Sequence, residues 1–185
     1  MPFSENAWKL FSECEARRKE LHLAARQDCL CVSIGEQKLW HFRDGQPLAA
    51  YSVSTSRAAP SCVPDSLGTP TGLHQTVERI GENAPAGMVF KGRQPLGFSF
   101  ADAPEEMQKE NLITSRILWL DGLEQGKNRG PGCDTHARYV YLHGTNQEDK
   151  IGTPNSHGCV LLRNADMIAL FDSISSAAFV WISLA

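Results

Sequence analysis

The sequence predicts a mainly β fold of the α+β class, with one helix before the strands and another near the end. Three observations support this prediction. Helical spacing covers the first part of the chain, short strand-like runs separated by turn residues follow, and a second helical pattern covers residues 164–173. With 185 residues, 42% of them apolar, the chain has the size and composition of one globular domain.

Residues 5 to about 25 have helical spacing, with apolar residues on one side, charged residues on the other and Ser4 as a suitable cap. The apolar positions are Ala7, Leu10, Phe11, Cys14 and Leu21. We therefore assign residues 1–28 to a helical segment that packs on the domain, and residues 29–185 to a single domain. A helix that binds a partner protein is the alternative.

The strand-like runs follow from residue 31 onward. The breaks at Gly35-Glu36 and Arg43-Asp44-Gly45 have the composition of hairpin turns. Residues 56–72, rich in Pro, Ser and Gly, are expected to form a loop, and the glycine-rich residues 121–135 a mobile connection. The predicted strands are 31–34, 38–42, 48–54, 73–77, 88–91, 112–120, 138–143 and 179–184.

Charge and hydropathy exclude several classes of partner. The net charge of -3 does not indicate a nucleic-acid partner, and no apolar run is long enough to span a membrane. Charged residues at positions 5, 9, 13, 15 and 17–20 interrupt the apolar core that an export signal requires. We therefore expect a cytoplasmic protein with reduced cysteines, and the periplasm is the alternative. Cys29 and Cys31 are interpreted as strand side chains on one face.

The densest group of reactive side chains lies in Tyr141-Leu142-His143-Gly144-Thr145 and Ser156-His157-Gly158-Cys159. A thiol attacks a carbonyl as the thiolate, and a neighbouring imidazole can serve as its base. Cys159 is therefore the candidate nucleophile and His143 the candidate base. A packed structural cysteine is one alternative. A zinc site is another, and it would use His143, His157 and Cys159 with Cys133 or His136.

The spacing of these residues does not match the usual spacing of zinc ligands, so we expect neither a metal nor another cofactor.

One longer stretch carries a resemblance to a known family. Residues 143–166 read HGTNQEDKIGTPNSHGCVLLRNAD, and the upstream segment Gly68-Thr69-Pro70-Thr71-Gly72 contains a Thr-Pro-x-Gly element. Together they resemble the signature of the YkuD-type L,D-transpeptidase catalytic domain, over roughly residues 30–172. The resemblance implies a YkuD-like β-sandwich or barrel, with one helix before it and one after the catalytic cysteine.

The family's mechanism proceeds through a thioester. By resemblance, Cys159 is the nucleophile, His143 is the base, and the Gly144 carbonyl orients the imidazole. The backbone amides of Gly158 and Cys159 would form the oxyanion hole. The same resemblance has His157 shape the pocket and Ser156 hold the loop by hydrogen bonds.

The chain departs from the family at Leu161, where an Arg or Asn usually follows the cysteine and an apolar residue. A cation in that position would pair with a substrate carboxylate. Candidates for this role elsewhere are Arg163, Arg138 and Arg116, and Thr145 is a further substrate-binding candidate.

The family acts on peptidoglycan stem peptides, at the bond between the L-centre of a diamino acid and a terminal D-Ala. A cytoplasmic enzyme would meet soluble fragments, so water would accept the acyl group. We therefore expect an L,D-carboxypeptidase that removes D-Ala from murein tetrapeptides. The alternatives are an L,D-transpeptidase that makes wall cross-links and a domain that binds stem peptides without catalysis.

Overall fold

The computed structural model describes residues 3–174 and 176–185. Its helices are α1 (Glu5–Glu20), α2 (Glu105–Gln108) and α3 (Asn164–Ser173), with short 3-10 turns at Phe100–Asp102 and Glu148–Lys150. The strands are β1 (Asp28–Ser33), β2 (Lys38–Arg43), β3 (Gln46–Ser52), β4 (Gly72–Ile80), β5 (Met88–Lys91), β6 (Gln94–Ser99), β7 (Ile113–Gly122), β8 (Tyr141–Gly144), β9 (Val160–Leu162) and β10 (Phe179–Ser183).

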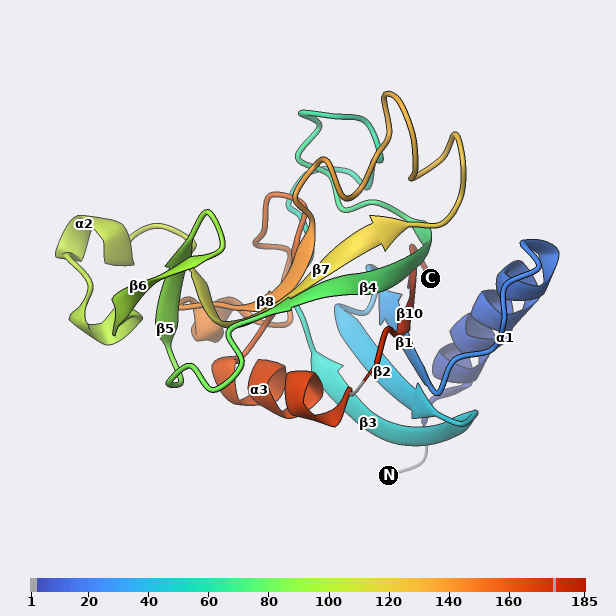
Figure 1. Ribbon diagram of the computed structural model, residues 1–185, viewed down its shortest axis with the longest axis horizontal. Helices are drawn as coiled ribbons and strands as arrows, with labels where there is room; N and C mark the ends of the chain where they lie inside the picture. The colour runs from blue at the N-terminus through green and yellow to red at the C-terminus, as the bar shows by residue number, and fades with distance from the viewer. Residues whose placement is uncertain (1–2, 175) are drawn as a thin grey trace.

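In the described part of the chain, ten strands form one sheet in the order β3-β2-β1-β10-β4-β7-β5-β6, from which β8 and β9 branch at β7. The prediction of a mainly β fold, with one helix before the strands and another near the end of the chain, is confirmed. Figure 1 shows α1 at one side of this sheet, α3 below it, and β5, β6 and α2 extending away from both helices. None of the described helices combines the length and apolar character needed to span a membrane.

The sheet is covered on both faces where α1 and α3 pack. Along β1, Cys29 and Cys31 face α1, whereas Leu30 and Val32 join the core beneath α3, as the alternation of strand side chains requires. The sulfur atoms of Cys14 and Cys29 lie 3.2 Å apart in this packing. The prediction that Cys29 and Cys31 share one face is therefore confirmed.

Local signals predicted several elements closely. Ser4 caps α1 by accepting a hydrogen bond from the Ala7 amide, and the predicted strand 88–91 and helix 164–173 agree with the structure. Asp44 and Gly45 both have positive φ angles, 50° and 73°, as a two-residue hairpin turn requires.

Other boundaries were wrong. The first helix ends at residue 20 rather than about 25, and the strand expected from residue 138 begins at Tyr141. Tyr139 has φ 57°, which is incompatible with a strand. β6 was missed because Pro95 and Gly97 interrupt its pattern, and β9 because it is only three residues long.

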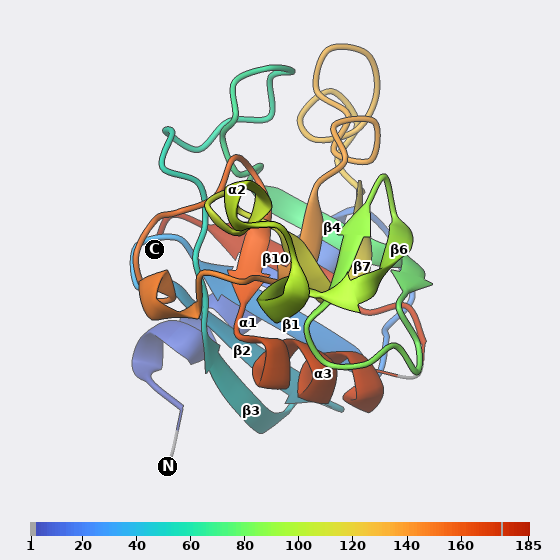
Figure 2. The ribbon, with the colours of Figure 1, turned by 90° about the vertical axis from the view of Figure 1, so that its left-hand side faces the viewer.

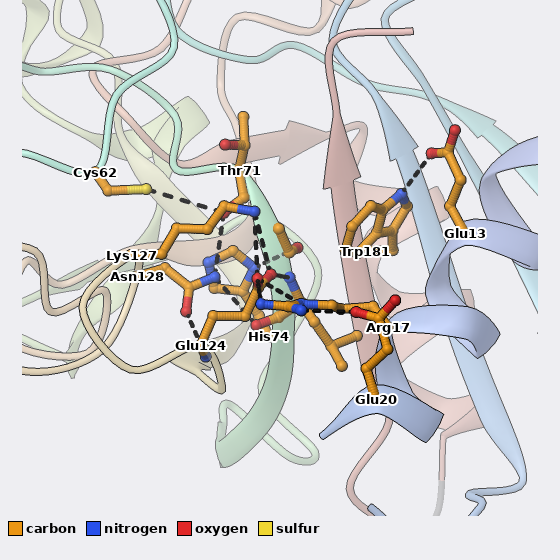
Figure 3. Close-up of polar contacts among 12 residues, drawn as sticks. Glu13, Arg17, Glu20, Cys62, Thr71, His74, Glu124, Lys127, Asn128 and Trp181 are labelled. Carbon is orange, nitrogen blue, oxygen red and sulfur yellow. Dashed lines mark hydrogen bonds and ion pairs between the residues drawn. The ribbon is translucent and has the colours of Figure 1, made fainter. Parts of the chain in front are cut away.

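Two loops rise together above the sheet in both views, one from residues 53–71 and one from the connection between β7 and β8 (Figure 2). The second loop is the connection for which mobility is predicted, and a buried carboxylate anchors its first residues to the rest of the fold (Figure 3). The side chain of Glu124, only 2% exposed, accepts hydrogen bonds from the Leu73 amide at 2.6 Å and from Arg17 Nε at 2.7 Å. The ammonium group of Lys127 lies 3.3 Å from the same carboxylate. The loop is thereby joined to α1 and β4.

Burial disfavours the ionised form of Glu124, but the Leu73 amide, Lys127 and Arg17 outweigh it and lower the pKa of this carboxyl group. A group with a lowered pKa contributes stability above its unfolded-state pKa and loses that contribution as the pH falls through its folded-state pKa. Glu124 therefore stabilises the loop at neutral pH and loses this effect in acid.

We expect Glu124→Ala to lower the free energy of unfolding by about 1–3 kcal/mol at pH 7. The expected loss is no larger because water partly screens the two cations that pair with Glu124, Arg17 and Lys127. Urea denaturation would measure it, and the difference from the wild type should shrink in acid. Glu20→Ala is the matched control, because Glu20 also pairs with Arg17 but its side chain is 62% exposed. Equal effects of the two substitutions would contradict the anchoring role of Glu124.

Candidate active site

The loop that precedes β9 holds Cys159 in a defined place. Ser156 Oγ donates to the Cys159 carbonyl at 2.6 Å and accepts from the Gly158 amide at 3.2 Å. Gly158 has φ 127°, a conformation that residues with a side chain rarely adopt. The prediction that Ser156 holds the loop by hydrogen bonds matches these contacts.

Pairing of β8 with β9 brings the thiol and the imidazole to the same face of the sheet. The two strands are parallel, with Leu142 opposite Val160 and His143 opposite Leu161. Cys159 therefore lies beside Tyr141, whose amide donates to its sulfur at 3.4 Å. Because strand side chains alternate, Cys159, Tyr141 and His143 face the same way. The chain thus brings Cys159 and His143 together as diagonal neighbours.

The Gly144 carbonyl lies where it can orient the imidazole. The His143 Nδ1 atom is 2.7 Å from the Gly144 oxygen. Since a carbonyl only accepts hydrogen bonds, Nδ1 carries the proton, and Nε2 of the neutral ring keeps its lone pair. His143 is buried, with 4% of its surface exposed. The ring is therefore set up as a proton acceptor through Nε2.

Removal from water favours the neutral form of both groups, although Cys159 is only partly buried. Removal from water lowers the pKa of His143 to about 4, against a smaller opposing effect of the Gly144 carbonyl. Burial likewise raises the pKa of the Cys159 thiol to about 11, although the Tyr141 amide and the Arg138 guanidinium both act to lower it. The resting site is therefore a thiol beside a neutral imidazole, rather than a thiolate–imidazolium pair.

Arg138 is the candidate cation that the fold brings near the thiol. Its guanidinium donates to the Ser61 carbonyl at 2.9 Å and to the Gly68 carbonyl at 2.8 Å. It thereby fastens the loop of residues 53–71 next to Cys159. It also lines a pocket of about 260 Å³ with Tyr139 and His157.

The other proposed substrate-binding residues do not reach this place. The Arg116 guanidinium is buried against the Phe171 ring, 5.6 Å from its centroid, and donates to the Ala84 carbonyl. Arg163 lies beyond the opposite end of β9, 4.0 Å from the Asp166 carboxylate. Thr145 is fully buried and donates to Asn111 Oδ1. The first two lie away from the thiol, because β7 turns Arg116 toward α3 and β9 separates Arg163 from Cys159.

His157 lies where the prediction puts it, at a pocket, whereas only one of the two amides predicted for the oxyanion hole is available. His157 is exposed, lines the pocket, and receives a hydrogen bond from Arg57 Nη2 at 2.9 Å. The Gly158 amide is engaged by Ser156, so it does not point freely toward a substrate. The Cys159 amide has no acceptor among the described residues, which leaves it as the available donor for an oxyanion.

The alternative of a zinc site lacks the necessary geometry. Across residues 3–174 and 176–185, no group of three or more His, Cys, Asp or Glu side chains is arranged to hold a metal ion.

Sequence reasoning placed Tyr141 in the reactive segment without giving it a role, and it missed Arg57. The Tyr141 amide donates to the sulfur because β8 and β9 pair in parallel, and Arg57 comes from a loop without regular structure. Neither contact follows from a local pattern, because each joins segments far apart in the chain.

A thiol directly before β9 and an oriented imidazole in the neighbouring strand β8 form a candidate cysteine-enzyme site on a mainly β fold. The chain belongs to the YkuD family, whose L,D-transpeptidase catalytic domain profile matches residues 27–182. A comparison with curated protein sequences finds no match.

Three solved structures illustrate the shared fold. An L,D-transpeptidase from Mycobacterium smegmatis is 14% identical with a TM-score of 0.53, covering 85% of this chain and 58% of its own. A cysteine-to-serine mutant of the Enterococcus faecium L,D-transpeptidase is 14% identical with a TM-score of 0.51, covering 85% and 50%. L,D-transpeptidase 3 from Mycobacterium tuberculosis with a faropenem-derived adduct is 13% identical with a TM-score of 0.53, covering 85% and 60%. The chain therefore spans less than two thirds of each relative.

We expect alkylation of Cys159 by iodoacetamide to accelerate roughly tenfold per pH unit from pH 7 to 10 without levelling off, because only the thiolate reacts. Mass spectrometry would locate the label, with the partly exposed Cys62 and Cys133 as internal controls. Arg138→Gln should slow the reaction at each pH, whereas Arg138→Lys should retain most of it. A plateau already at pH 7 would instead indicate a preformed thiolate.

Proposed function

We propose that the chain is a cysteine L,D-carboxypeptidase that releases terminal D-Ala from murein tetrapeptides in the cytoplasm. The observation that carries the chemistry is the juxtaposition of Cys159 with a buried, neutral His143 whose Nδ1 is held by the Gly144 carbonyl. Membership of the YkuD family supports the substrate class, a peptidoglycan stem peptide. Water as the acceptor is part of this proposal, and the products of the reaction test it.

In the first half of the reaction, the Cys159 thiol gives its proton to His143 Nε2 as the sulfur attacks the carbonyl carbon of the L,D-peptide bond. Because the pKa of the thiol lies above that of the imidazole, the proton moves as the sulfur–carbon bond forms. The Cys159 amide donates to the developing oxyanion. His143 then protonates the amine of D-Ala, the carbon–nitrogen bond breaks, and a thioester remains.

In the second half, His143 takes a proton from water while the water oxygen attacks the thioester carbon. The carbon–sulfur bond breaks, and the sulfur receives the proton from His143, which restores the thiol. The products are the tripeptide acid and D-Ala. An L,D-transpeptidase would use the same thioester but transfer its acyl group to an amine, which makes this reaction the second candidate.

Incubation with a disaccharide tetrapeptide should release one alanine, detected by mass spectrometry as a tripeptide product. Cys159→Ala should abolish the release, and His143→Gln should reduce the rate by roughly 10²–10⁴-fold because general-base assistance is lost. Far-ultraviolet circular dichroism of both variants controls for folding. Cross-linked dimers without tripeptide would favour the transpeptidase, and turnover by Cys159→Ala would refute the mechanism.

Structures of L,D-transpeptidases have been solved with imipenem and with a faropenem-derived adduct. We therefore expect a carbapenem to acylate Cys159 of this chain and to add its mass to a single peptide. His143→Gln should slow the acylation, because the thiol then lacks its base. The remaining cysteines are the internal controls, and labelling spread over all of them would contradict a selective nucleophile.

A further inference from the structure

A second pocket, of about 460 Å³, shares His157 with the pocket that Arg138 lines. Its wall includes the loop that leads to Cys159, because His157 and Asn155 both line it. His157 precedes Cys159 by two residues, so their Cα atoms lie at most roughly 7 Å apart. A substrate attacked by Cys159 can therefore extend a side chain into this second pocket.

Hydrogen bonds between side chains hold one wall of the pocket in place. Asn155, 7% exposed, donates to Gln147 Oε1 at 2.8 Å, and Asn111 donates to the Asn155 carbonyl at 3.1 Å. Lys150 Nζ donates to the same Gln147 oxygen at 2.9 Å. The wall is thus arranged before any ligand arrives, which reduces the entropy lost on binding.

The charges facing the pocket are incompletely paired. Among the described residues, no carboxylate lies within 4 Å of the Arg57 guanidinium or of the Lys150 ammonium group. The Arg57 side chain makes one hydrogen bond in this part of the chain, to His157, and the Lys150 side chain makes one to Gln147. Glu110 likewise has no cation within 4 Å in the described part of the chain. Lys109 also lines the pocket, but Glu106 pairs with it at 3.0 Å. The pocket therefore offers two free cations and one free carboxylate.

Such a charge pattern complements a group that carries both a carboxylate and an ammonium. We propose that the pocket binds the zwitterionic side-chain end of a diaminopimelate residue in the stem peptide. Arg57 and Lys150 pair with its carboxylate, and Glu110 pairs with its ammonium group. The assignment rests on the proposed function, since it places this diamino acid at the bond that Cys159 attacks.

The pocket beside Arg138 fits this role less well. The Arg138 guanidinium donates to the Ser61 and Gly68 carbonyls. In Arg57, only one guanidinium nitrogen donates to a described residue, His157, so the other N–H groups are available to a ligand. Leu161, buried beside His143, offers no charge where the family usually has a polar residue. Recognition of the substrate carboxylate is thereby moved to a loop residue, Arg57.

Calorimetry with the Cys159→Ala protein tests the assignment without turnover. The probes are three tetrapeptides that differ in the diamino acid: meso-diaminopimelate, its side-chain amide, and lysine. We expect the diaminopimelate peptide to bind roughly tenfold to a hundredfold more tightly than the other two, since they lack the carboxylate. Arg57→Gln should remove this preference, and Arg57→Lys should retain part of it. Glu110→Gln should weaken the binding of the diaminopimelate peptide and of the lysine peptide by a similar factor.

Lys19→Gln is the matched control, because it removes a positive charge from the exposed end of α1 and should leave the preference unchanged. Equal binding of the three peptides, or a preference that survives Arg57→Gln, would overturn the assignment. D-Ala release by the intact enzyme is measured separately. A preference without release contradicts the proposed reaction alone, whereas release without a preference contradicts the assignment of the pocket alone.

Discussion

The short parallel pairing of β8 with β9 is the constraint on which the site depends. It sets Val160 opposite Leu142, and so places Cys159 beside Tyr141 and on the face that carries His143. β7 fixes β8 in turn by pairing Ile117 with His143. A slip of one residue would turn the thiol to the opposite face, because side chains alternate along a strand. Three residues of β9 therefore determine whether a base is within reach of the nucleophile.

Removal from water sets the chemistry of this pair. The same apolar surroundings that lower the pKa of His143 raise the pKa of Cys159, so the two effects favour an uncharged resting state. Polar groups that favour the thiolate come from outside the pair, namely the Tyr141 amide and the Arg138 guanidinium. A neutral thiol is a weaker nucleophile than a thiolate, so the sulfur becomes reactive as it gives up its proton.

Two loops around the site are held by buried or half-buried charged groups. Arg138 fastens residues 53–71 through backbone carbonyls, and Glu124 fastens the connection between β7 and β8 to α1 and β4 (Figure 3). These charges have their partners within the protein. The unpaired charges of Arg57, Lys150 and Glu110 differ in this respect, and that difference is the physical basis for assigning them to a ligand.

The sequence by itself determined the fold class, the helix at 164–173 and the identities of the thiol and the imidazole, because periodicity, turn residues and the Ser-His-Gly-Cys motif are local features. Only the tertiary structure decided which arginine approaches the sulfur. Arg138 does so, whereas Arg116 and Arg163 are turned elsewhere by strand direction. It also decided the protonation state of the pair and the engagement of the Gly158 amide by Ser156. These properties arise from burial and from contacts between distant segments, which no local pattern encodes.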